Sequence, residues 1–573
     1  MRGFFKRKVS IGMIVTFMFL SFFSGYIPKA TANDELAPPT HEFGGEKEYM
    51  VEMSDGIKLK TYVAFPEGEG PWPVLMTRNP YSNSTARERD KAKVFAKYGY
   101  AAVVQEARGT GGSEGKWVPF ENERKDGIDT LQWLSKQSWN NGKIGTHGNS
   151  YLGFTQWVIA DQPEVTTMFI TVFGTERYKQ MYNNGMFRPD IYTSWTMGNA
   201  GVPPLSGKTY EDALMVRPQV NMDQEIFGVE LPWYRDWVTN VSPEAPFWQS
   251  GLWAELGKMP SKVNVPVFFV GGWYDHHFEG MLYAWNNLSK SVKDQSRFVI
   301  GPWNHVQVSA GQLEYPNGAI NQLKAQLEWF NHHLKDEPYN YSTGNIESYV
   351  IGEGVWKNWK QNGTAPQKLY LTGQGGLDHH PPAKENTISY QYDPDHPVLT
   401  NGAESVLGGM FTLAGPRLQE APGYRDDVIT FVSEPLKEDL RLSGRIKANL
   451  YVASDAEDTS FTVKVSEVFP DGKAYNIRNG ITSLAYRNGA TTPQTYKPGE
   501  VIDVNIETWP ITWTIKKGSR IRVDISSSNF PEYMPHSNYA GIWGLQGQLK
   551  VAKQTLSTGG KHHSYIEIPS IKK

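Results

Sequence analysis

A serine flanked by glycines, placed between a strand-like run and a helical run, constrains the fold of this chain more than any other feature. The apolar run 144–147 leads into Gly148-Asn149-Ser150-Tyr151-Leu152-Gly153, and a helical stretch continues to Ala160. A serine on a tight turn between a strand and a helix has a strained backbone conformation. The residues beside it must be small, because the neighbouring backbone segments approach each other closely there. The pattern is close to G-x-S-x-G, with its last glycine one place later. It predicts a nucleophile elbow, although glycine-rich turns also serve packing alone.

The segments around Ser150 alternate between short apolar strands and helices. A hairpin comes first, because Ser54-Asp55-Gly56 separates two strand-like runs and Asp-Gly readily adopts positive φ. The strands and helices that follow lie at residues 73–77, 88–98, 100–105, 126–135 and 144–147. Parallel strands joined by helices need cover on both faces of their sheet. The sequence therefore predicts a doubly wound α/β layer with Ser150 at its C-terminal edge.

The chain changes character twice after the Ser150 turn. Strand alternation stops at about residue 176, and a segment rich in tryptophan, methionine and tyrosine predicts an inserted cap to about residue 262. Apolar strands resume at 265–270 and 297–300, and a helix at 321–334 closes this part. Beyond about residue 344, period-two runs broken by Gly, Pro and Asp predict an all-β sandwich, a jelly roll. A chain of 573 residues is long enough for several such cores.

The N-terminus has the three parts of a secretory signal peptide. Basic residues precede an apolar run from Val9 to about Tyr26, and the small-residue site Ala30-Thr31-Ala32 follows. We expect cleavage after Ala32 and a secreted protein. The alternative is that the segment is retained as a membrane anchor, because its apolar run is just long enough to span a bilayer. The expected boundaries are a signal peptide at 1–32, the α/β domain at 33–175 and 263–345, the cap at 176–262 and the β domain at 346–573.

Composition excludes several classes of function. The formal net charge is −3 with both signs interspersed, so no basic stripe indicates nucleic-acid binding. There is no cysteine, which excludes disulfides, thiolate chemistry and cysteine metal sites. Adjacent histidine pairs occur at 276–277, 332–333, 379–380 and 562–563. Adjacent residues rarely reach one ion together, and no spacing suggests a third ligand, so we expect no metal and no cofactor.

Two polar residues that follow the later strands complete a possible catalytic set. Asp275 comes after Gly271-Gly272-Trp273-Tyr274, and His305 comes after Gly301-Pro302-Trp303-Asn304. Serine needs a general base that a carboxylate orients, and α/β-hydrolases carry the three in the order Ser, Asp, His. We predict Ser150 as nucleophile, His305 as base and then acid, and Asp275 as the group that orients the imidazole. Taken alone, His305 could be a buried histidine with a structural role, and Asp275 could be an aspartate that forms a turn.

An oxyanion hole needs two hydrogen-bond donors beside the nucleophile. The Tyr151 amide, at the start of the helix after Ser150, is the first candidate. The second is the Tyr81 hydroxyl, because Pro80 stiffens the turn that follows the strand 73–77.

These motifs, with others along the chain, resemble those of a known family. They are Arg78-Asn79-Pro80-Tyr81, Ala107-Arg108-Gly109 with Ser113-Glu114-Gly115, Gly148-x-Ser150-Tyr151-Leu152-Gly153, Gly272-Trp273-Tyr274-Asp275, Gly301-Pro302-Trp303-x-His305, Phe469-Pro470-Asp471-Gly472 and Ser526-Ser527-Ser528-Asn529-Phe530-Pro531. The family includes cocaine esterase, α-amino-acid ester hydrolases, Xaa-Pro dipeptidyl-peptidases and certain cephalosporin acylases. The resemblance implies an α/β-hydrolase domain, an inserted helical cap and a C-terminal jelly roll, with the triad and the tyrosine donor assigned above.

Departures from the family narrow the substrate. α-Amino-acid ester hydrolases resemble one another in carrying acidic residues two and three positions after the triad aspartate, where they bind an α-ammonium group. Here those positions are His277 and Phe278, which disfavours amino-acyl substrates. Xaa-Pro dipeptidyl-peptidases are generally longer, with an extra N-terminal domain that this sequence does not show, which disfavours that specificity too.

The candidate substrate-binding residues are Trp157, Arg177, Lys179, His276, His277 and Phe278. Arg177 and Lys179, together with Arg188, lie near the start of the predicted cap. If they face the acyl pocket, they would favour a neutral or anionic acyl group, such as a glutaryl-like chain. The alternative is that these cations lie on the solvated outer face of the cap.

The sequence therefore predicts an exported serine hydrolase that cleaves esters or amides of small acyl groups through an acyl-enzyme. The alternatives are a side-chain acylase of the glutaryl-cephalosporin type, an Xaa-Pro dipeptidyl-peptidase-like activity, and a jelly-roll surface-binding protein with a vestigial hydrolase core. The expected partner is a small ester or amide, without nucleic acid and without a membrane after signal cleavage. The sequence leaves open whether the protein forms a homo-oligomer.

Overall fold

Residues 35–361, 363, 365–402, 404 and 414–571 are described by a computed structural model. The expected signal peptide at residues 1–32 and its cleavage site lie outside these residues. No helix in the described part of the chain is long and apolar enough to cross a membrane.

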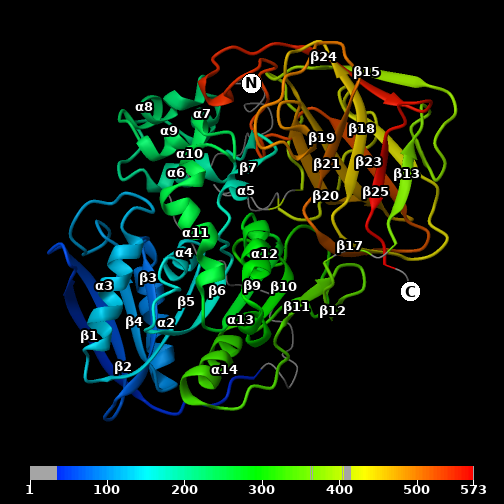
Figure 1. Cartoon of the computed structure of the whole chain (residues 1–573). Helices are drawn as coiled ribbons and strands as arrows, with labels where there is room; N and C mark the ends of the chain where they lie inside the picture. Colours follow the sequence, from blue (N-terminus) through cyan, green and yellow to red (C-terminus); the bar gives the residue numbers. More distant parts are fainter. Residues whose placement is uncertain (1–34, 362, 364, 403, 405–413, 572–573) are drawn as a thin grey trace.

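The N-terminal half is built on a mixed ten-stranded sheet, counted over the described residues, in the order β1-β2-β4-β3-β5-β6-β9-β10-β11-β12 (Figure 1). Its strands are β1 (Phe43–Glu52), β2 (Lys58–Pro66), β3 (Trp72–Asn79), β4 (Ala101–Glu106), β5 (Asn140–Asn149), β6 (Val165–Thr171), β9 (Val267–Tyr274), β10 (Arg297–Asn304), β11 (Asn345–Val350) and β12 (Val355–Asn358). All neighbours from β4 to β11 pair in parallel. Their carboxyl ends therefore meet at one edge, where Ser150 lies.

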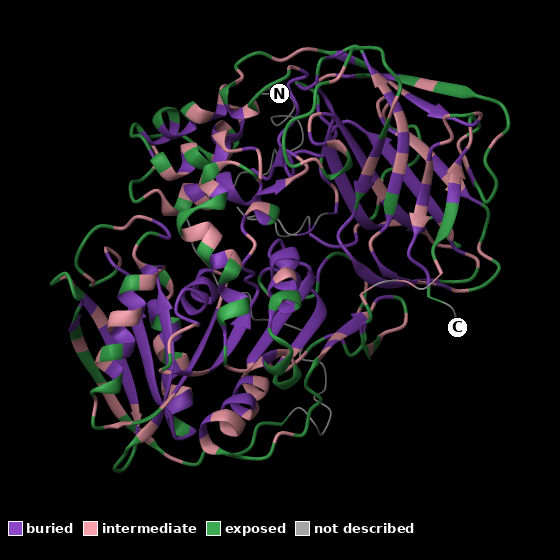
Figure 2. Ribbon diagram, viewed as in Figure 1, coloured by how far each residue is buried: buried purple, intermediate pink, exposed green. Residues whose placement is uncertain are grey.

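Helices cover both faces of this sheet, which explains why most residues of its central strands are buried. On one face, α2 (Thr85–Lys97) and α14 (Gln322–Lys335) pack through Phe95 and Phe330. On the other face lie α3 (Glu123–Ser135), α4 (Tyr151–Trp157) and α12 (Phe278–Asn287), while α13 (Lys290–Gln295) precedes β10. Figure 2 shows the central strands as an almost continuous buried layer.

A helical cap interrupts the sheet between β6 and β9. Its elements are α5 (Tyr178–Met181), β7 (Tyr182–Asn183), β8 (Met186–Phe187), α6 (Tyr192–Asn199), α7 (Tyr210–Met215), α8 (Met222–Phe227), α9 (Pro232–Thr239), α10 (Pro246–Gln249) and α11 (Gly251–Lys262). The cap also contacts the C-terminal part, because the Met534 amide donates to the Phe187 carbonyl at 3.0 Å.

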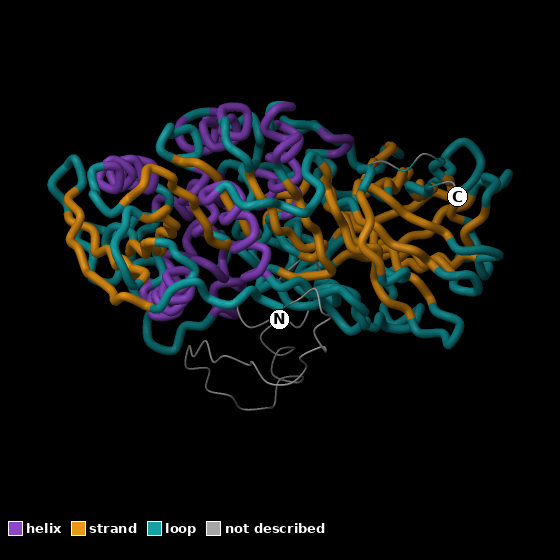
Figure 3. Tube along the Cα trace, turned by 90° about the horizontal axis from the view of Figure 1, so that it is seen from below, coloured by secondary structure: helices purple, strands orange, loops and turns teal. Residues whose placement is uncertain are grey.

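The C-terminal part is a β domain beside the cap and the first sheet (Figures 1 and 3). Its strands are β13 (Gln367–Leu371), β14 (Gly376–Asp378), β15 (Asn386–Tyr392), β16 (Ile429–Ser433), β17 (Leu440–Gly444), β18 (Lys447–Ser454), β19 (Ser460–Val468), β20 (Ala474–Ser483), β21 (Ile502–Glu507), β22 (Ile511–Ile515), β23 (Arg520–Ser526), β24 (Ala552–Thr558) and β25 (Tyr565–Ile568). Within the described residues, β17 and β22 form a two-stranded sheet and the others one larger sheet. The Ile351 amide donates to the Thr512 carbonyl at 3.2 Å and joins the domains.

The structure confirms the expected fold class and differs from the expected elements in three places. The sequence reading did not predict β6, which lies between the helix after Ser150 and the cap. Strands β9 and β10 continue to Tyr274 and Asn304, beyond the strand ends expected at residues 270 and 300. Strands β11 and β12 extend the first sheet, whereas the β domain was expected to begin at residue 346.

Candidate active site

The turn between β5 and α4 has the geometry that its sequence predicts. Ser150 adopts φ 55° and ψ −124°, a conformation that L-residues rarely occupy. A Cβ at Gly148 would lie 2.4 Å from the Leu152 Cβ, and one at Gly153 would lie 2.7 Å from the Phe173 Cβ. Side chains at either glycine would therefore clash with the helix or with the loop after β6. The two glycines permit the turn, and the turn exposes the serine oxygen.

Three side chains from different strand ends form a hydrogen-bonded chain. Ser150 Oγ lies 3.0 Å from His305 Nε2, and His305 Nδ1 lies 2.7 Å from Asp275 Oδ1. Asp275 is fully buried and His305 is 8% exposed, so the polar chain is largely shielded from water. The arrangement can move a proton from the serine to an imidazole that a carboxylate orients.

The sheet explains how residues far apart in sequence meet here. Tyr274 and Asn304 are register partners at the ends of β9 and β10, and Asp275 and His305 follow them directly. Ser150 is held from the other side, because its amide donates to the Thr171 carbonyl at the end of β6 at 3.0 Å. The chain order Ser, Asp, His thus becomes spatial proximity at the carboxyl edge of the sheet.

Tyr81 lies against Tyr151, the residue after Ser150, with ring centroids 6.1 Å apart, and a cap residue holds its hydroxyl. The Trp195 indole N–H donates to Tyr81 Oη at 3.1 Å, and the Tyr81 amide donates to Asn79 Oδ1 at 3.0 Å. Because Oη accepts from Trp195, its own proton remains available for another acceptor. Burial raises the pKa of Tyr81 to about 12, so the hydroxyl stays protonated. The sequence reading missed Trp195, because nothing local to α6 connects it with residue 81.

The Tyr151 side chain anchors the second proposed donor. Its hydroxyl donates to the Glu123 carboxyl group and accepts from the Phe120 amide at 2.7 Å. Burial raises the pKa of Glu123 to about 7, and burial also raises the pKa of the Tyr151 hydroxyl. The Tyr151 amide precedes the hydrogen bonds of α4, which begin with Gly153 N–H donating to the Ser150 carbonyl at 2.7 Å. Glu123 was also missed, because its partner is separated from it in sequence.

Among the predicted pocket residues, two histidines lie against the triad. The His276 ring centroid is 4.2 Å from those of both His277 and His305. Both rings are buried, and this burial lowers the pKa of His276 and of His277 well below the usual value, so they are neutral at pH 7. They therefore offer no negative charge to an α-ammonium group.

Arg177 is a buried cation close to the proposed oxyanion donors. Its guanidinium lies 4.6 to 5.4 Å from four aromatic ring centroids, those of Phe120, Tyr192, Trp237 and Trp253. Its polar contacts are Gln180 Oε1 and Tyr192 Oη, each at 3.4 Å, and no carboxylate of the described residues pairs with it. Burial lowers the pKa of Arg177. A desolvated cation without a counter-ion is energetically costly unless an anion joins it.

Three other candidates are packed in the protein interior. Trp157, the last residue of α4, is fully buried with its ring centroid 5.9 Å from that of Phe269, so it packs in the core of the α/β domain. Phe278 is likewise fully buried, edge-on to Trp273 at 5.1 Å. Arg188 is buried in ion pairs with Asp190 and Glu532, at 2.8 and 3.7 Å. It therefore links the cap to the β domain and does not line an open pocket.

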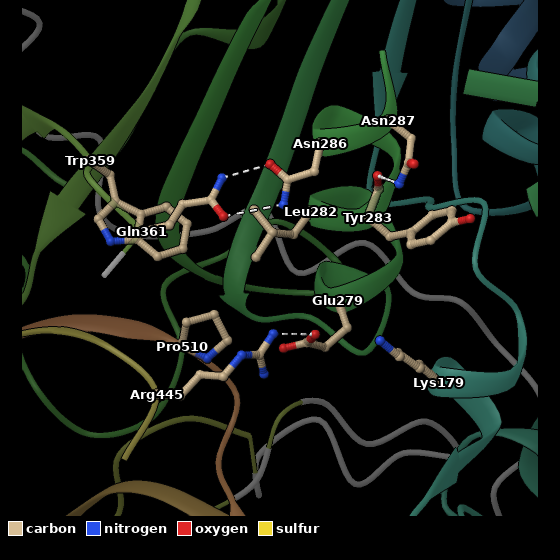
Figure 4. A pocket seen from close by; sticks show the side chains of 10 residues that line it. All are labelled: Lys179, Glu279, Leu282, Tyr283, Asn286, Asn287, Trp359, Gln361, Arg445 and Pro510. Carbon is tan, nitrogen blue, oxygen red and sulfur yellow. Dashed lines mark hydrogen bonds and ion pairs between the residues drawn. The ribbon is translucent and has the colours of Figure 1, made fainter. Parts of the chain in front are cut away.

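Lys179 is exposed and lines a groove between the cap, α12 and the β domain (Figure 4). The groove has a volume of about 180 Å³, and Glu279 and Arg445 face each other across it at 2.7 Å. Lys179 thus matches the alternative of a solvated cation, whereas Arg177 and Arg188 do not.

Comparison with known proteins places this fold and site in a family. The model of X-Pro dipeptidyl-peptidase (S15 family) matches residues 55–307, and that of the X-Pro dipeptidyl-peptidase C-terminal non-catalytic domain matches residues 342–567. The chain belongs to the cocaine esterase and X-Pro dipeptidyl-peptidase-like family of α/β-hydrolases. This confirms the resemblance inferred from the motifs, and it makes the protein a serine hydrolase of the cocaine-esterase type.

Several known proteins align over most of the chain. Cocaine esterase of Rhodococcus sp. (strain MB1 Bresler) is 29% identical over 572 residues, which cover 91% of this chain and 98% of that protein. The structure of an aminopeptidase from the marine sediment archaeon Thaumarchaeota archaeon is 23% identical, with a TM-score of 0.81. The match covers 96% of this chain and 100% of the aminopeptidase chain. An α-amino acid ester hydrolase is 24% identical with a TM-score of 0.78 and the same coverage. At such identities, the two solved structures support the fold alone.

Proposed function

We propose that the protein is an exported hydrolase that cleaves esters or amides of small acyl groups through an acyl-enzyme at Ser150. The observation that carries this proposal is the continuous chain from Ser150 Oγ through His305 to Asp275, with bonds of 3.0 and 2.7 Å. A vestigial core in a surface-binding protein would have no need to keep a strained serine, an imidazole and a buried carboxylate in register.

In the proposed reaction, His305 Nε2 takes the Ser150 proton as Oγ attacks the carbonyl carbon of the substrate. The negative charge that develops on the carbonyl oxygen is stabilised by the Tyr81 hydroxyl and the Tyr151 amide. His305 then gives its proton to the departing alcohol or amine, which leaves the acyl group on Ser150. A water molecule, deprotonated by the same imidazole, releases the acid. Asp275 holds the His305 Nδ1–H throughout and stabilises the imidazolium.

The surroundings of the nucleophile favour a neutral or anionic acyl group over an α-ammonium group. His277 and Phe278 are uncharged at the positions where amino-ester hydrolases are expected to be acidic, and Arg177 is a buried cation without a carboxylate partner among the described residues. A carboxylate-terminated acyl chain would supply that partner. The aromatic rings around Arg177 would cover the apolar part of the chain. This supports acylase-like activity on a glutaryl-like group as the second candidate and disfavours dipeptidyl-peptidase activity.

A panel of nitrophenyl esters and nitroanilides tests the class and the acyl preference together. The proposal expects turnover of esters, a burst of nitrophenol equal to the enzyme concentration if deacylation is slower, and higher kcat/KM for neutral or carboxylate-terminated chains. Preference for an α-ammonium acyl chain would contradict the assignment of the pocket. Absence of turnover on every ester would favour the surface-binding alternative.

A further inference from the structure

Three imidazoles converge beside the proposed nucleophile. The ligand nitrogens of His276, His277 and His305 all lie within 4.8 Å of one another, and all three residues are buried. His305 comes from the end of β10, whereas the other two follow Asp275 after β9. The sequence shows no third ligand near this adjacent histidine pair. The fold supplies one from a neighbouring strand.

Two of these imidazoles carry nitrogens that nothing else uses. His276 Nδ1 and His277 Nδ1 are buried and have no hydrogen-bond partner among the described residues, and neither has Asp275 Oδ2. His276 Nδ1 also lies 3.6 Å from Asp275 Oδ1. Buried polar atoms are nearly always paired in native proteins, so several unpaired acceptors in one place point to a ligand.

We propose that this cluster binds a divalent transition-metal ion, such as Zn²⁺, Cu²⁺ or Co²⁺, which reversibly inhibits the enzyme by occupying His305. Imidazole nitrogen suits these ions, and three protein ligands leave a fourth position for water. Zinc-bound imidazole nitrogens lie about 2.0–2.1 Å from the ion, so modest rotations of the rings would bring the nitrogens into range. Metal binding and proton transfer both need the imidazole of His305, so the two exclude each other.

Nearby charges set how strongly the ion is held. The negative charge of Asp275 attracts a cation to the cluster. The positive charges of Arg177 and Arg188 repel a cation bound to His276 and His277. Arg188 is offset by its own carboxylates, Asp190 and Glu532. Arg177 has no such partner among the described residues, so it is the main cation that opposes the ion. The affinity should therefore increase in Arg177→Gln, which removes this charge.

Calorimetric titration of Zn²⁺ into the metal-free mature protein tests binding without reference to activity. We expect one ion per chain and a Kd raised at least about 10-fold in both His276→Asn and His277→Asn, because each loses one of three ligands. The second adjacent pair, His332 and His333 on α14, provides the matched control, since no third ligand lies near it in the described residues. His332→Asn and His333→Asn should leave the Kd unchanged. No stoichiometric binding, or equal Kd values in all four variants, would overturn the proposal.

A second measurement tests the inhibition, which rests on the proposed role of His305. Zn²⁺ should slow covalent labelling of Ser150 by a fluorophosphonate, EDTA should restore it, and residual labelling of His277→Asn should be at least about 10-fold less sensitive to the ion. Mg²⁺ at the same concentration should have no effect, because it prefers oxygen ligands. If Ser150 is not the nucleophile, labelling fails with and without Zn²⁺ while calorimetric binding persists. Binding that leaves labelling unchanged would refute the inhibitory role of the site.

Discussion

Replacement of Trp195 by phenylalanine tests how the cap prepares the proposed oxyanion hole. The change removes the indole N–H that donates to Tyr81 Oη at 3.1 Å, and it keeps an aromatic ring parallel to that of Tyr151, whose centroid is 6.3 Å away. The Trp195 hydrogen bond lowers the pKa of Tyr81 against the larger effect of burial. Without it, the hydroxyl becomes a weaker acid, a weaker donor and less well oriented.

The expected loss follows from the energy of one neutral hydrogen bond, about 0.5–1.5 kcal/mol, which corresponds to a decrease in kcat of about 2- to 13-fold. Tyr81→Phe removes the donor itself and should decrease kcat about 100-fold, or roughly 3 kcal/mol. In the double variant, Trp195→Phe should cause little further loss, because its effect acts through the Tyr81 hydroxyl. Stopped-flow hydrolysis of a nitrophenyl ester measures all four proteins. The reasoning would be refuted if Trp195→Phe decreased kcat equally in the parent protein and in the Tyr81→Phe variant. It would also be refuted if Trp195→Phe changed only KM.

Three further predictions concern the pocket, the pH dependence and the β domain. Arg177→Ala should lower kcat/KM for a carboxylate-terminated ester at least about 10-fold more than for its neutral analogue, with Lys179→Ala as the exposed control; equal losses would contradict the anionic pocket. Burial raises the folded-state pKa of Glu123 from 4.5 to about 7, so its stabilising effect is present below pH 4.5 and is lost as the pH rises towards 7. In the parent protein, the unfolding free energy should therefore fall by an amount on the order of 3 kcal/mol between pH 4.5 and 7 because of Glu123. Urea titrations of Glu123→Gln should lack this part of the decrease. A fragment of residues 33–361 should be insoluble or inactive, because it exposes the cap surface that packs on the β domain and leaves the buried Arg188 without Glu532; a soluble, fully active fragment would show that the β domain is independent.

The parts of the site that could be predicted from sequence are those with local or ordered signals. The glycines around Ser150 indicate the turn because only small side chains fit there, and Asp275 and His305 follow apolar strands in an order that a parallel sheet converts into proximity. Trp195 and Glu123 gave no such signal, because each meets its tyrosine through packing between distant segments. The packing of Trp157 in the core could not be predicted, because a tryptophan near a nucleophile has the same sequence appearance whether it faces the pocket or the core.

Fluorophosphonate labelling followed by peptide mass spectrometry tests the central claim most directly. The account predicts stoichiometric modification at Ser150 of the full chain, with rates that decrease strongly in His305→Ala. It also predicts that Ser150→Ala is unlabelled and folded, and that its ester hydrolysis is lower by about 10⁴-fold or more. Labelling at another residue, or near-normal turnover by Ser150→Ala, would contradict it.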